Sequence, residues 1–172
     1  SRQQTTYSGT VDTTGVTDPA PEAIYRSYAY ATGGDNTLRW QIPATDGTYT
    51  LRLHFLETGY SSWNARAFDV VLQGDVADDD FDLMATAGAT GKVVVRDYTV
   101  TASGGTGISL RLERSGSTFN GKSNQSPRAS GIELLAANPA GTVGATADVD
   151  VSLDSGTTWT TIASGIALDR YG

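Results

Sequence analysis

The chain has 172 residues, of which 38% are apolar and 18% charged, enough for one buried core of modest size. Its formal net charge is −7, which disfavours nucleic acid as a partner because an acidic surface repels phosphate. The absence of cysteine excludes disulfides and thiolate metal sites, and no apolar run approaches the roughly 20 residues of a membrane span. We therefore expect neither nucleic acid nor membrane as a partner.

Short stretches of alternating apolar and polar residues run along most of the chain. In TYTLRLHFL (48–56), Leu51, Leu53 and Phe55 face one way, whereas Arg52 and His54 face the other. Turn signals such as ATDGT, LQGD and ASGGTG separate these stretches. The pattern predicts an all-β protein, an antiparallel β-sandwich. In chain order, the expected strands cover residues 23–31, 37–42, 48–56, 66–73, 92–100, 107–113 and 131–136.

Two stretches between these strands show no alternation. MATAGAT (84–90) favours a helix, but glycine interrupts it, so we expect at most a turn. The run GDVADDDFDL (74–83) concentrates aspartates, and we expect a solvated acidic turn there. Calcium binding by these carboxylates is the alternative.

The C-terminal part differs from the rest. AANPAGTVGATA (136–147) resembles a linker, and ADVDVSLDSGTTWTTIA (147–163) predicts a hairpin. Within it, SLDSGTTW (152–159) fits the Asp-box pattern, which indicates a stabilised hairpin turn. About 30 residues cannot hold a core alone. We therefore predict a sandwich over residues 1–137, with a linker and hairpin over 138–172 that pack on it or begin a further module.

Catalytic chemistry finds little support in the residue types present. His54 is the only histidine, it lies mid-strand on the polar face, and there is no serine elbow, so we expect a surface histidine without catalytic or metal-binding work. A glycosidase needs two carboxylates about 5 to 10 Å apart. Glu57 is the best candidate because it begins a loop rich in aromatics, whereas Glu113 and Glu133 fall on outward positions. We expect no enzyme activity.

Aromatic and amide side chains gather in the predicted loops and strand ends. A loop that only reverses the chain would use Gly, Asp and Ser, yet HFLETGYSSWNARAFDVVLQG (54–74) carries two large aromatics. Sugars stack on such rings while amides bond to their hydroxyls. The alternative is that the rings fold back over the sandwich end as a small core. The candidate ligand-binding residues are Tyr28, Tyr30, Tyr60, Trp63, Asn64, Asn124 and Gln125.

Taken in order, several motifs resemble the malectin and malectin-like family of carbohydrate-binding domains. They are DPAPEAIYRSYAYA, WQIPATDGTYTLRLHFLE, ARAFDVVLQG, FDLMATAG and SGIELL, and the resemblance covers residues 18–135. It implies a jelly-roll type of sandwich that binds sugar through loop aromatics at one end.

By position, a ligand tyrosine of that family falls on Tyr30 and an aromatic pair falls on Gly59 and Tyr60. Trp63, three residues after Tyr60, would take the place of the aromatic residue that is absent at position 59. A ligand aspartate falls near Asn124 or Gln125. The start, SRQQTTYSGTV, lacks the family's opening motif, so the first strand stays unassigned.

We therefore predict a non-catalytic carbohydrate-binding module that binds oligosaccharide or polysaccharide without a cofactor. Its parent would be a larger modular glycoside hydrolase or surface protein, secreted or at the cell surface and bacterial, with other modules of that parent as partners. One alternative is a protein–protein interaction or adhesion module. The other is a catalytic jelly-roll glycosidase or lyase that uses Glu57.

Overall fold

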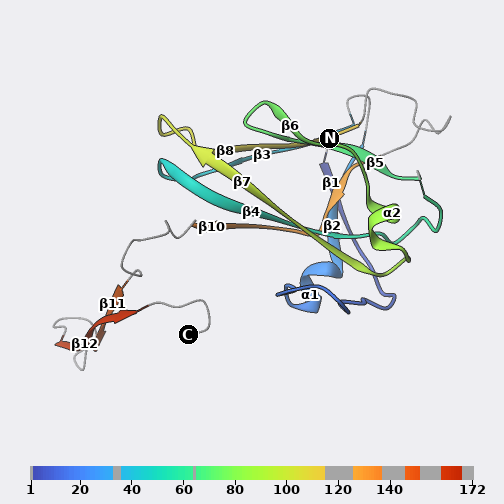
Figure 1. Cartoon of the computed structure of the whole chain (residues 1–172). Helices are drawn as coiled ribbons and strands as arrows, with labels where there is room; N and C mark the ends of the chain where they lie inside the picture. The colour runs from blue at the N-terminus through green and yellow to red at the C-terminus, as the bar shows by residue number, and fades with distance from the viewer. Residues whose placement is uncertain are drawn as a thin grey trace. The chain divides into compact units, whose positions relative to one another are not determined.

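The computed structural model describes residues 2–32, 36–63, 65–114, 126–136, 146–151 and 160–167 (Figure 1). The chain divides into two compact units, Ser1–Ala136 and Ala137–Gly172. The second unit contains an antiparallel pair of strands, β11 (Thr146–Val151) and β12 (Thr160–Ala167). The Asp-box residues 152–159 lie outside the described residues. Whether this unit packs on the sandwich or begins a further module stays a prediction.

The first unit contains three sheets, with strand orders β3-β8-β5-β6, β10-β4-β7 and β1-β2-β9. Every pairing between these strands is antiparallel, so the predicted all-β class is confirmed. Neither helix of the described chain is long and apolar enough to cross a membrane. The elements are β1 (Arg2–Thr6), α1 (Glu22–Tyr25), β2 (Ser27–Ala31), β3 (Thr37–Ile42), β4 (Gly47–Leu56), β5 (Ala67–Leu72), β6 (Asp75–Asp82), α2 (Leu83–Ala87), β7 (Val93–Ala102), β8 (Ile108–Glu113), β9 (Arg128–Ala129) and β10 (Gly131–Ala136).

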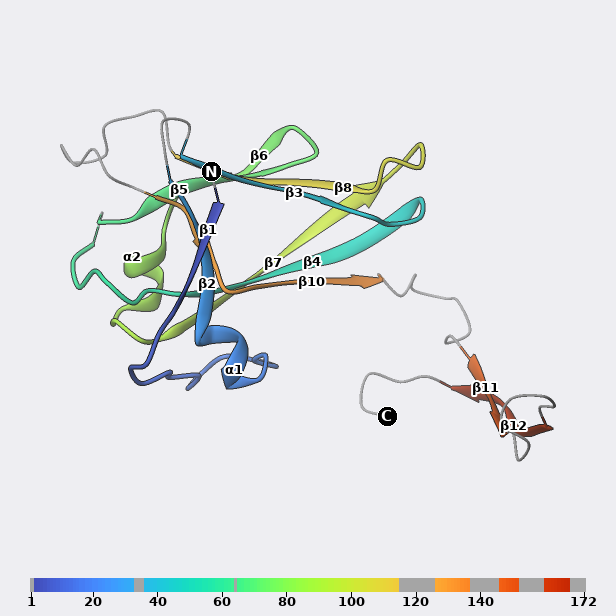
Figure 2. The same ribbon diagram turned by 180° about the vertical axis from the view of Figure 1, so that it is seen from behind.

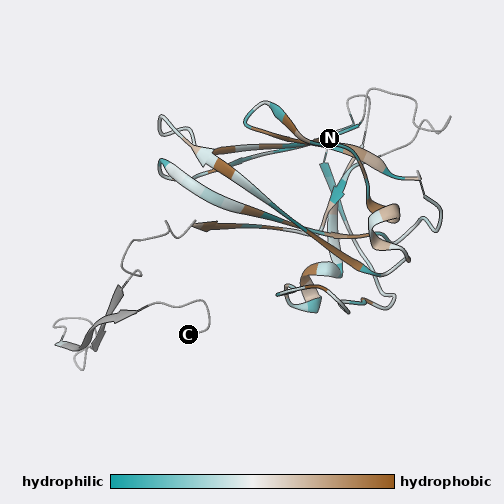
Figure 3. Ribbon diagram, viewed as in Figure 1, coloured by the Kyte–Doolittle hydropathy of each residue, from teal (hydrophilic) through white to brown (hydrophobic). Residues whose placement is uncertain are grey.

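The two larger sheets face each other and enclose the main core (Figures 1 and 2). Phe55 of β4 meets Phe68 of β5 and Phe81 of β6, with ring centroids 5.2 to 5.9 Å apart. Each buried ring of this size contributes about 1.5 to 3 kcal/mol by leaving water. Hydrophobic residues concentrate on the strands of this core, whereas β1 is hydrophilic along its length (Figure 3). The predicted alternation of β4 is correct for its core-facing residues, since Leu51, Leu53 and Phe55 are fully buried.

The acidic run is a strand and not the solvated turn that we expected. Gln73 and Gly74 both take positive φ, the conformation of a two-residue hairpin turn, and β6 returns antiparallel to β5. Phe81 faces the core, whereas the aspartates are exposed or half-buried on a strand at the edge of its sheet. Charged residues suit such an edge because they discourage pairing with another chain.

The N-terminal part departs from expectation in two ways. Residues 2–6, which we left unassigned, form β1 and pair with β2 along its whole length. The expected strand over 23–31 begins only at Ser27, because Glu22–Tyr25 form the short helix α1 after Pro21. Tyr25 is fully buried with Leu56 and Val93, so this segment contributes to a second small core.

The predicted surface position of His54 is wrong, because its side chain is fully buried. The Tyr25 hydroxyl accepts the Ala20 N–H at 3.0 Å and lies 2.7 Å from Nδ1 of His54. Which of these two atoms donates the hydrogen bond depends on the tautomer of the His54 ring. Nε2 lies 3.0 Å from Oε1 of Glu133, close but not aligned as a hydrogen bond. Burial lowers the pKa of His54, and the nearby Glu133 carboxylate only partly opposes this.

Replacing Tyr25 by Phe should lower the free energy of unfolding by about 1 to 3 kcal/mol, because two buried hydrogen-bonding groups lose their partner. Urea denaturation of Tyr25→Phe measures this loss. Tyr49→Phe is the matched control, since the Tyr49 hydroxyl bonds to Thr45 at an exposed position. Equal losses in the two variants would contradict a structural role for the Tyr25 hydroxyl.

The ring signals of His54 should titrate below the ordinary histidine pKa of about 6.5, because burial disfavours the imidazolium. A folded-state pKa below the unfolded one means that the unfolded chain binds the proton more tightly. The stability from this group is therefore complete above about pH 6.5 and declines as the pH falls. NMR spectroscopy can follow the single histidine without mutation. A midpoint at or above 6.5 would contradict the buried neutral ring.

Candidate binding site

One face of the sheet β1-β2-β9 carries polar and aromatic side chains. Thr5 pairs with Tyr28, Gln3 pairs with Tyr30, and Tyr30 pairs in turn with Arg128. Because paired residues share a face and side chains alternate along each strand, these five residues lie on the same side of the sheet. The Tyr30 hydroxyl donates to Oε1 of Gln3 at 2.7 Å, which fixes the ring against β1.

A hollow of about 360 Å³ opens over this face. Residues 57–66, which connect β4 to β5, supply its second wall with Tyr60 and Arg66. The hollow therefore combines strand residues with loop residues that are far apart in sequence. Its lining consists of Thr5, Tyr28, Tyr30, Tyr60, Arg66, Ser126 and Arg128.

Each of two arginines stacks on a tyrosine of the hollow. The Arg128 guanidinium carbon lies 4.3 Å from the Tyr28 ring centroid, and that of Arg66 lies 4.8 Å from the Tyr60 centroid. Tyr28 and Tyr30 are tilted neighbours with centroids 6.1 Å apart. A desolvated cation–π contact is worth about 2 kcal/mol and an exposed one about 0.5 to 1. The stacking fixes the ring orientations before any ligand arrives.

Glu57 lies beneath the hollow and is fully buried. Its Oε1 accepts the backbone N–H groups of Gly59 at 2.8 Å and Tyr60 at 3.0 Å, which shapes the start of the loop. Its Oε2 accepts Nε of Arg66 at 2.6 Å, and Nη1 of Arg128 lies 3.6 Å from Oε1. Burial alone would raise the pKa of the Glu57 carboxyl, but the two guanidinium groups hold that pKa below its ordinary value. Glu57 is thus an ionised structural residue.

Arg128 is held by the end of β4 and the residues that follow it. Nη1 donates to Oγ1 of Thr58 at 2.7 Å and to the Leu56 carbonyl at 3.3 Å. Arg66 anchors the same region by donating to the Ser126 carbonyl and to Glu57. Burial and the neighbouring Arg66 lower the pKa of Arg128. Around the hollow, the described residues place two guanidinium groups against one buried carboxylate.

A second hollow, of about 440 Å³, reaches the other face of the same sheet between β3 and β10. Its walls are mainly apolar and include Trp40, Ile42, Ile132 and Leu134. We place the candidate site in the Tyr28–Arg128 hollow because binding sites combine apolar surface with convergent polar groups, and the charged side chains converge there.

The model of the malectin domain matches residues 1–126. The chain belongs to the malectin domain family. Receptor-like protein kinase ANXUR2 of Arabidopsis thaliana is 26% identical over 128 residues, which cover 67% of the chain and 15% of that protein. The crystal structure of the ANXUR1 extracellular domain from Arabidopsis thaliana is 24% identical with a TM-score of 0.67, over 78% of the chain and 38% of that domain.

A third similar protein is a chain in the crystal structure of plant peptide RALF23 in complex with FER and LLG2. It is 22% identical with a TM-score of 0.66, and the match covers 80% of the present chain and 39% of the length of that relative. The malectin chain thus spans well under half the length of each of these three proteins. The structural likenesses establish the fold.

These comparisons correct our predicted partners. A malectin-type fold occurs in a crystal structure of a peptide in complex with proteins, and the relatives are receptor-like proteins. Our prediction of an oligosaccharide as partner, with no membrane, is therefore wrong. The relatives are plant proteins, which gives no support to a bacterial origin. Of the two binding functions that we predicted, carbohydrate binding and protein interaction, these findings favour protein interaction.

The malectin structure brings three of the seven predicted site residues together, Tyr28, Tyr30 and Tyr60. Trp63 is 71% exposed and does not line the hollow. Asn64, Asn124 and Gln125 lie outside the described residues. Our list of candidate residues left out Arg66 and Arg128, although each stands at or beside the start of a strand. Whether any of these residues binds a ligand stays a prediction.

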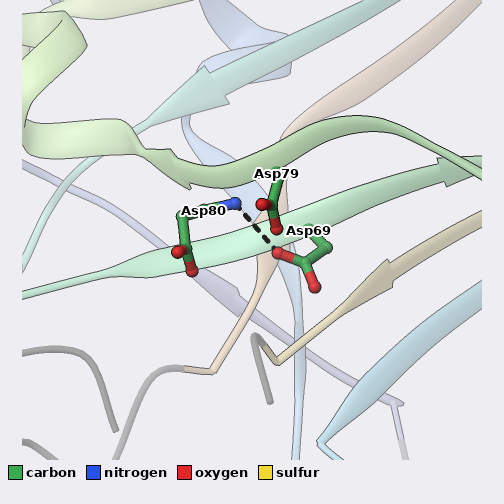
Figure 4. Close-up of side chains that lie close together, drawn as sticks. All are labelled: Asp69, Asp79 and Asp80. Atoms are coloured by element: carbon green, nitrogen blue, oxygen red, sulfur yellow. Dashed lines mark hydrogen bonds between the residues drawn. The ribbon is translucent and has the colours of Figure 1, made fainter. Parts of the chain in front are cut away.

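Three aspartates gather elsewhere on the malectin domain, between β5 and β6 (Figure 4). One carboxylate oxygen from each of Asp69, Asp79 and Asp80 lies within 4.8 Å of the others. The backbone N–H of Asp80 donates to Oδ1 of Asp69 at 2.9 Å. Burial raises the pKa of Asp69, and the carboxylates of Asp79 and Asp80 add to this. Calcium binding by this acidic strand stays a prediction.

Replacing Glu57 by Gln should destabilise the malectin domain by about 3 to 5 kcal/mol, because two buried guanidinium groups lose their shared counter-charge. Chemical denaturation monitored by tryptophan fluorescence measures the change. Glu113→Gln is the control, since Glu113 pairs with Arg111 at a half-exposed position and should cost less than about 1 kcal/mol. A Glu57→Gln variant as stable as this control would contradict the assigned role.

Proposed function

We propose that this malectin domain is a non-catalytic module that binds a peptide or protein segment in the Tyr28–Arg128 hollow. The observation that carries the proposal is the lining of the hollow, in which three tyrosines stand beside two buried arginines. Tyrosine and arginine are enriched among the residues that dominate protein interfaces. A catalytic carboxylate is not needed in this role, and Glu57 faces its own loop and guanidinium partners.

The hollow suits a ligand because its walls are already fixed. The rings of Tyr28 and Tyr60 are stacked on guanidinium groups, and Tyr30 is bonded to Gln3. Binding to ordered side chains loses less conformational entropy, at about 0.5 to 1.5 kcal/mol for each side chain that need not be immobilised. The tyrosine faces provide apolar contact, and their hydroxyls provide hydrogen bonds at the rim.

The similar proteins support this choice of partner and suggest a location. The fold occurs in the RALF23 complex with FER and LLG2, so a peptide is a reasonable partner for the present chain. The relatives include an extracellular domain, and we propose that this module also works outside the cell, as part of a receptor-like protein at its surface. We further propose that its two facing sheets belong to a sandwich of jelly-roll type.

Selection from a displayed library of random peptides should yield binders whose affinity depends on the hollow. The paired change Tyr28→Ala and Tyr60→Ala should weaken them by about 30-fold or more, because loss of a central interface residue costs about 2 kcal/mol or more. Trp63→Ala should change affinity less than about 3-fold, since Trp63 stands outside the hollow. Calorimetry on the selected peptides gives both ratios.

A panel of neutral oligosaccharides under the same conditions separates the two kinds of ligand. The proposal fails if no peptide is selected while an oligosaccharide binds and loses affinity in the Tyr28/Tyr60 double variant. It also fails if selected peptides depend on Trp63 and are indifferent to Tyr28 and Tyr60. Circular dichroism of each variant confirms that a loss of binding is not a loss of folding.

A further inference from the structure

We propose that the hollow selects a ligand segment that presents a single carboxylate, and that Arg128 receives it. This inference rests on the proposed peptide-binding function and adds the chemistry of the group that is recognised. The carboxylate comes from an aspartate or glutamate side chain or from a peptide C-terminus. All of these present the same anionic group. Its position would be against Arg128 and Tyr28, at the floor of the hollow.

The charges around the hollow do not balance among the described residues. Arg66 and Arg128 both line the hollow, and the carboxylate that contacts them among the described residues is Glu57. Arg66 and Glu57 form a close pair with Nε and Oε2 2.6 Å apart, whereas Arg128 is 3.6 Å from the same carboxylate. Among the described residues, the two guanidinium groups therefore share one carboxylate, and one positive charge has no counter-charge of its own. A ligand carboxylate would supply it.

The Arg128 side chain is buried and only partly hydrogen-bonded among the described residues. It is only 7% exposed, and its Nε has no hydrogen-bond partner among the described residues. A buried donor without a partner costs about 1 to 3 kcal/mol, so native structures usually satisfy such groups. The guanidinium is held by Thr58, the Leu56 carbonyl and the Tyr28 ring, so it is oriented before the ligand arrives. A carboxylate forms strong, charge-assisted bonds to such a fork.

The net charge of the chain limits how much negative charge a ligand can carry. The whole chain has a formal net charge of −7, so a polyanion is repelled by the rest of the surface. At physiological salt that repulsion is screened beyond about 8 Å, whereas contacts inside the hollow are not. One carboxylate matches the one excess guanidinium. The flanking residues of the ligand would be neutral and would lie on Tyr30 and Tyr60.

NMR titration of the whole labelled chain with short probes tests the inference. The probes are acetyl-Ala-Glu-Ala-amide, its glutamine counterpart acetyl-Ala-Gln-Ala-amide, and acetyl-Ala-Ala-Ala with a free C-terminal carboxylate, at about 0.15 M salt. We expect the glutamate probe to bind at least about tenfold more tightly than the glutamine probe, since a charge-assisted bond adds more than about 1.4 kcal/mol. The side-chain Nε–H signal of Arg128 and the ring signals of Tyr28 should shift. The free-acid probe shows which source of carboxylate is preferred.

Two variants separate the hollow from charge effects in general. Arg128→Gln leaves the Arg66–Glu57 pair intact and should abolish the difference between the glutamate and glutamine probes. Arg96→Gln is the matched control, because Arg96 also stacks on a ring, that of Phe81, away from the hollow. It should retain the full preference for glutamate. The comparison of probes on the unaltered chain remains decisive if Arg128→Gln fails to fold.

The possible results distinguish this inference from the proposed function. Equal affinity for the glutamate and glutamine probes, an absence of binding by every probe, or shifts confined to other basic residues would overturn the inference. Neutral peptides selected from the library would still support peptide binding in that case. If the glutamate probe binds at Arg128 while the library yields no binder and an oligosaccharide binds with dependence on Tyr28 and Tyr60, the anion preference stands and the proposed function fails.

Discussion

The candidate site depends on one buried carboxylate, that of Glu57. Its two oxygens together hold two backbone N–H groups of the following loop, the guanidinium group of Arg66 at the end of that loop and that of the distant Arg128. Transferring such charges out of water costs several kcal/mol for each ion, and the contacts among the opposite charges and with the loop backbone offset this cost. The loop, the end of β4 and the short strand β9 are consequently fixed together. Tyr28 and Tyr60 take their places on the arginines that Glu57 positions.

This arrangement explains how a small sheet becomes a binding surface. Strand alternation alone puts Tyr28 and Tyr30 on one face of β2, but it leaves them on a flat sheet open to water. The loop that Glu57 shapes adds the opposite wall, and the arginines give the floor a positive charge within an acidic protein. The site therefore combines apolar ring faces with a localised cation, which is suited to selecting among peptide segments.

Much of the fold could be predicted from alternation, because apolar residues with a period of two report a strand with one buried face. Prediction from alternation failed where a segment distant in sequence covers the polar face of a strand. His54 reads as a surface residue because nothing in TYTLRLHFL shows that Tyr25 and α1 pack over it. The strand β6 was missed because it lies at a sheet edge and its run of aspartates resembles the sequence of a solvated turn.

The candidate site was partly predictable for a similar reason. Residue type alone marked Tyr28, Tyr30 and Tyr60 as aromatics in unusual places, and the structure brings them into one hollow. The same reasoning placed Trp63 beside them, yet a loop sequence does not reveal which ring turns inward. Arg66 and Arg128 were left off the list of site residues, because an arginine near a strand end is usually solvated. Their burial depends on Glu57, whose own burial is a tertiary property.

A crystal structure of the chain with a library-selected peptide tests the central claim most directly. The account predicts a peptide lying across Tyr28, Tyr30 and Tyr60, with a carboxylate against the guanidinium of Arg128 and the Glu57 cluster unchanged. A peptide bound against the exposed Trp63 or in the hollow between β3 and β10, with the Tyr28–Arg128 hollow empty, would contradict it.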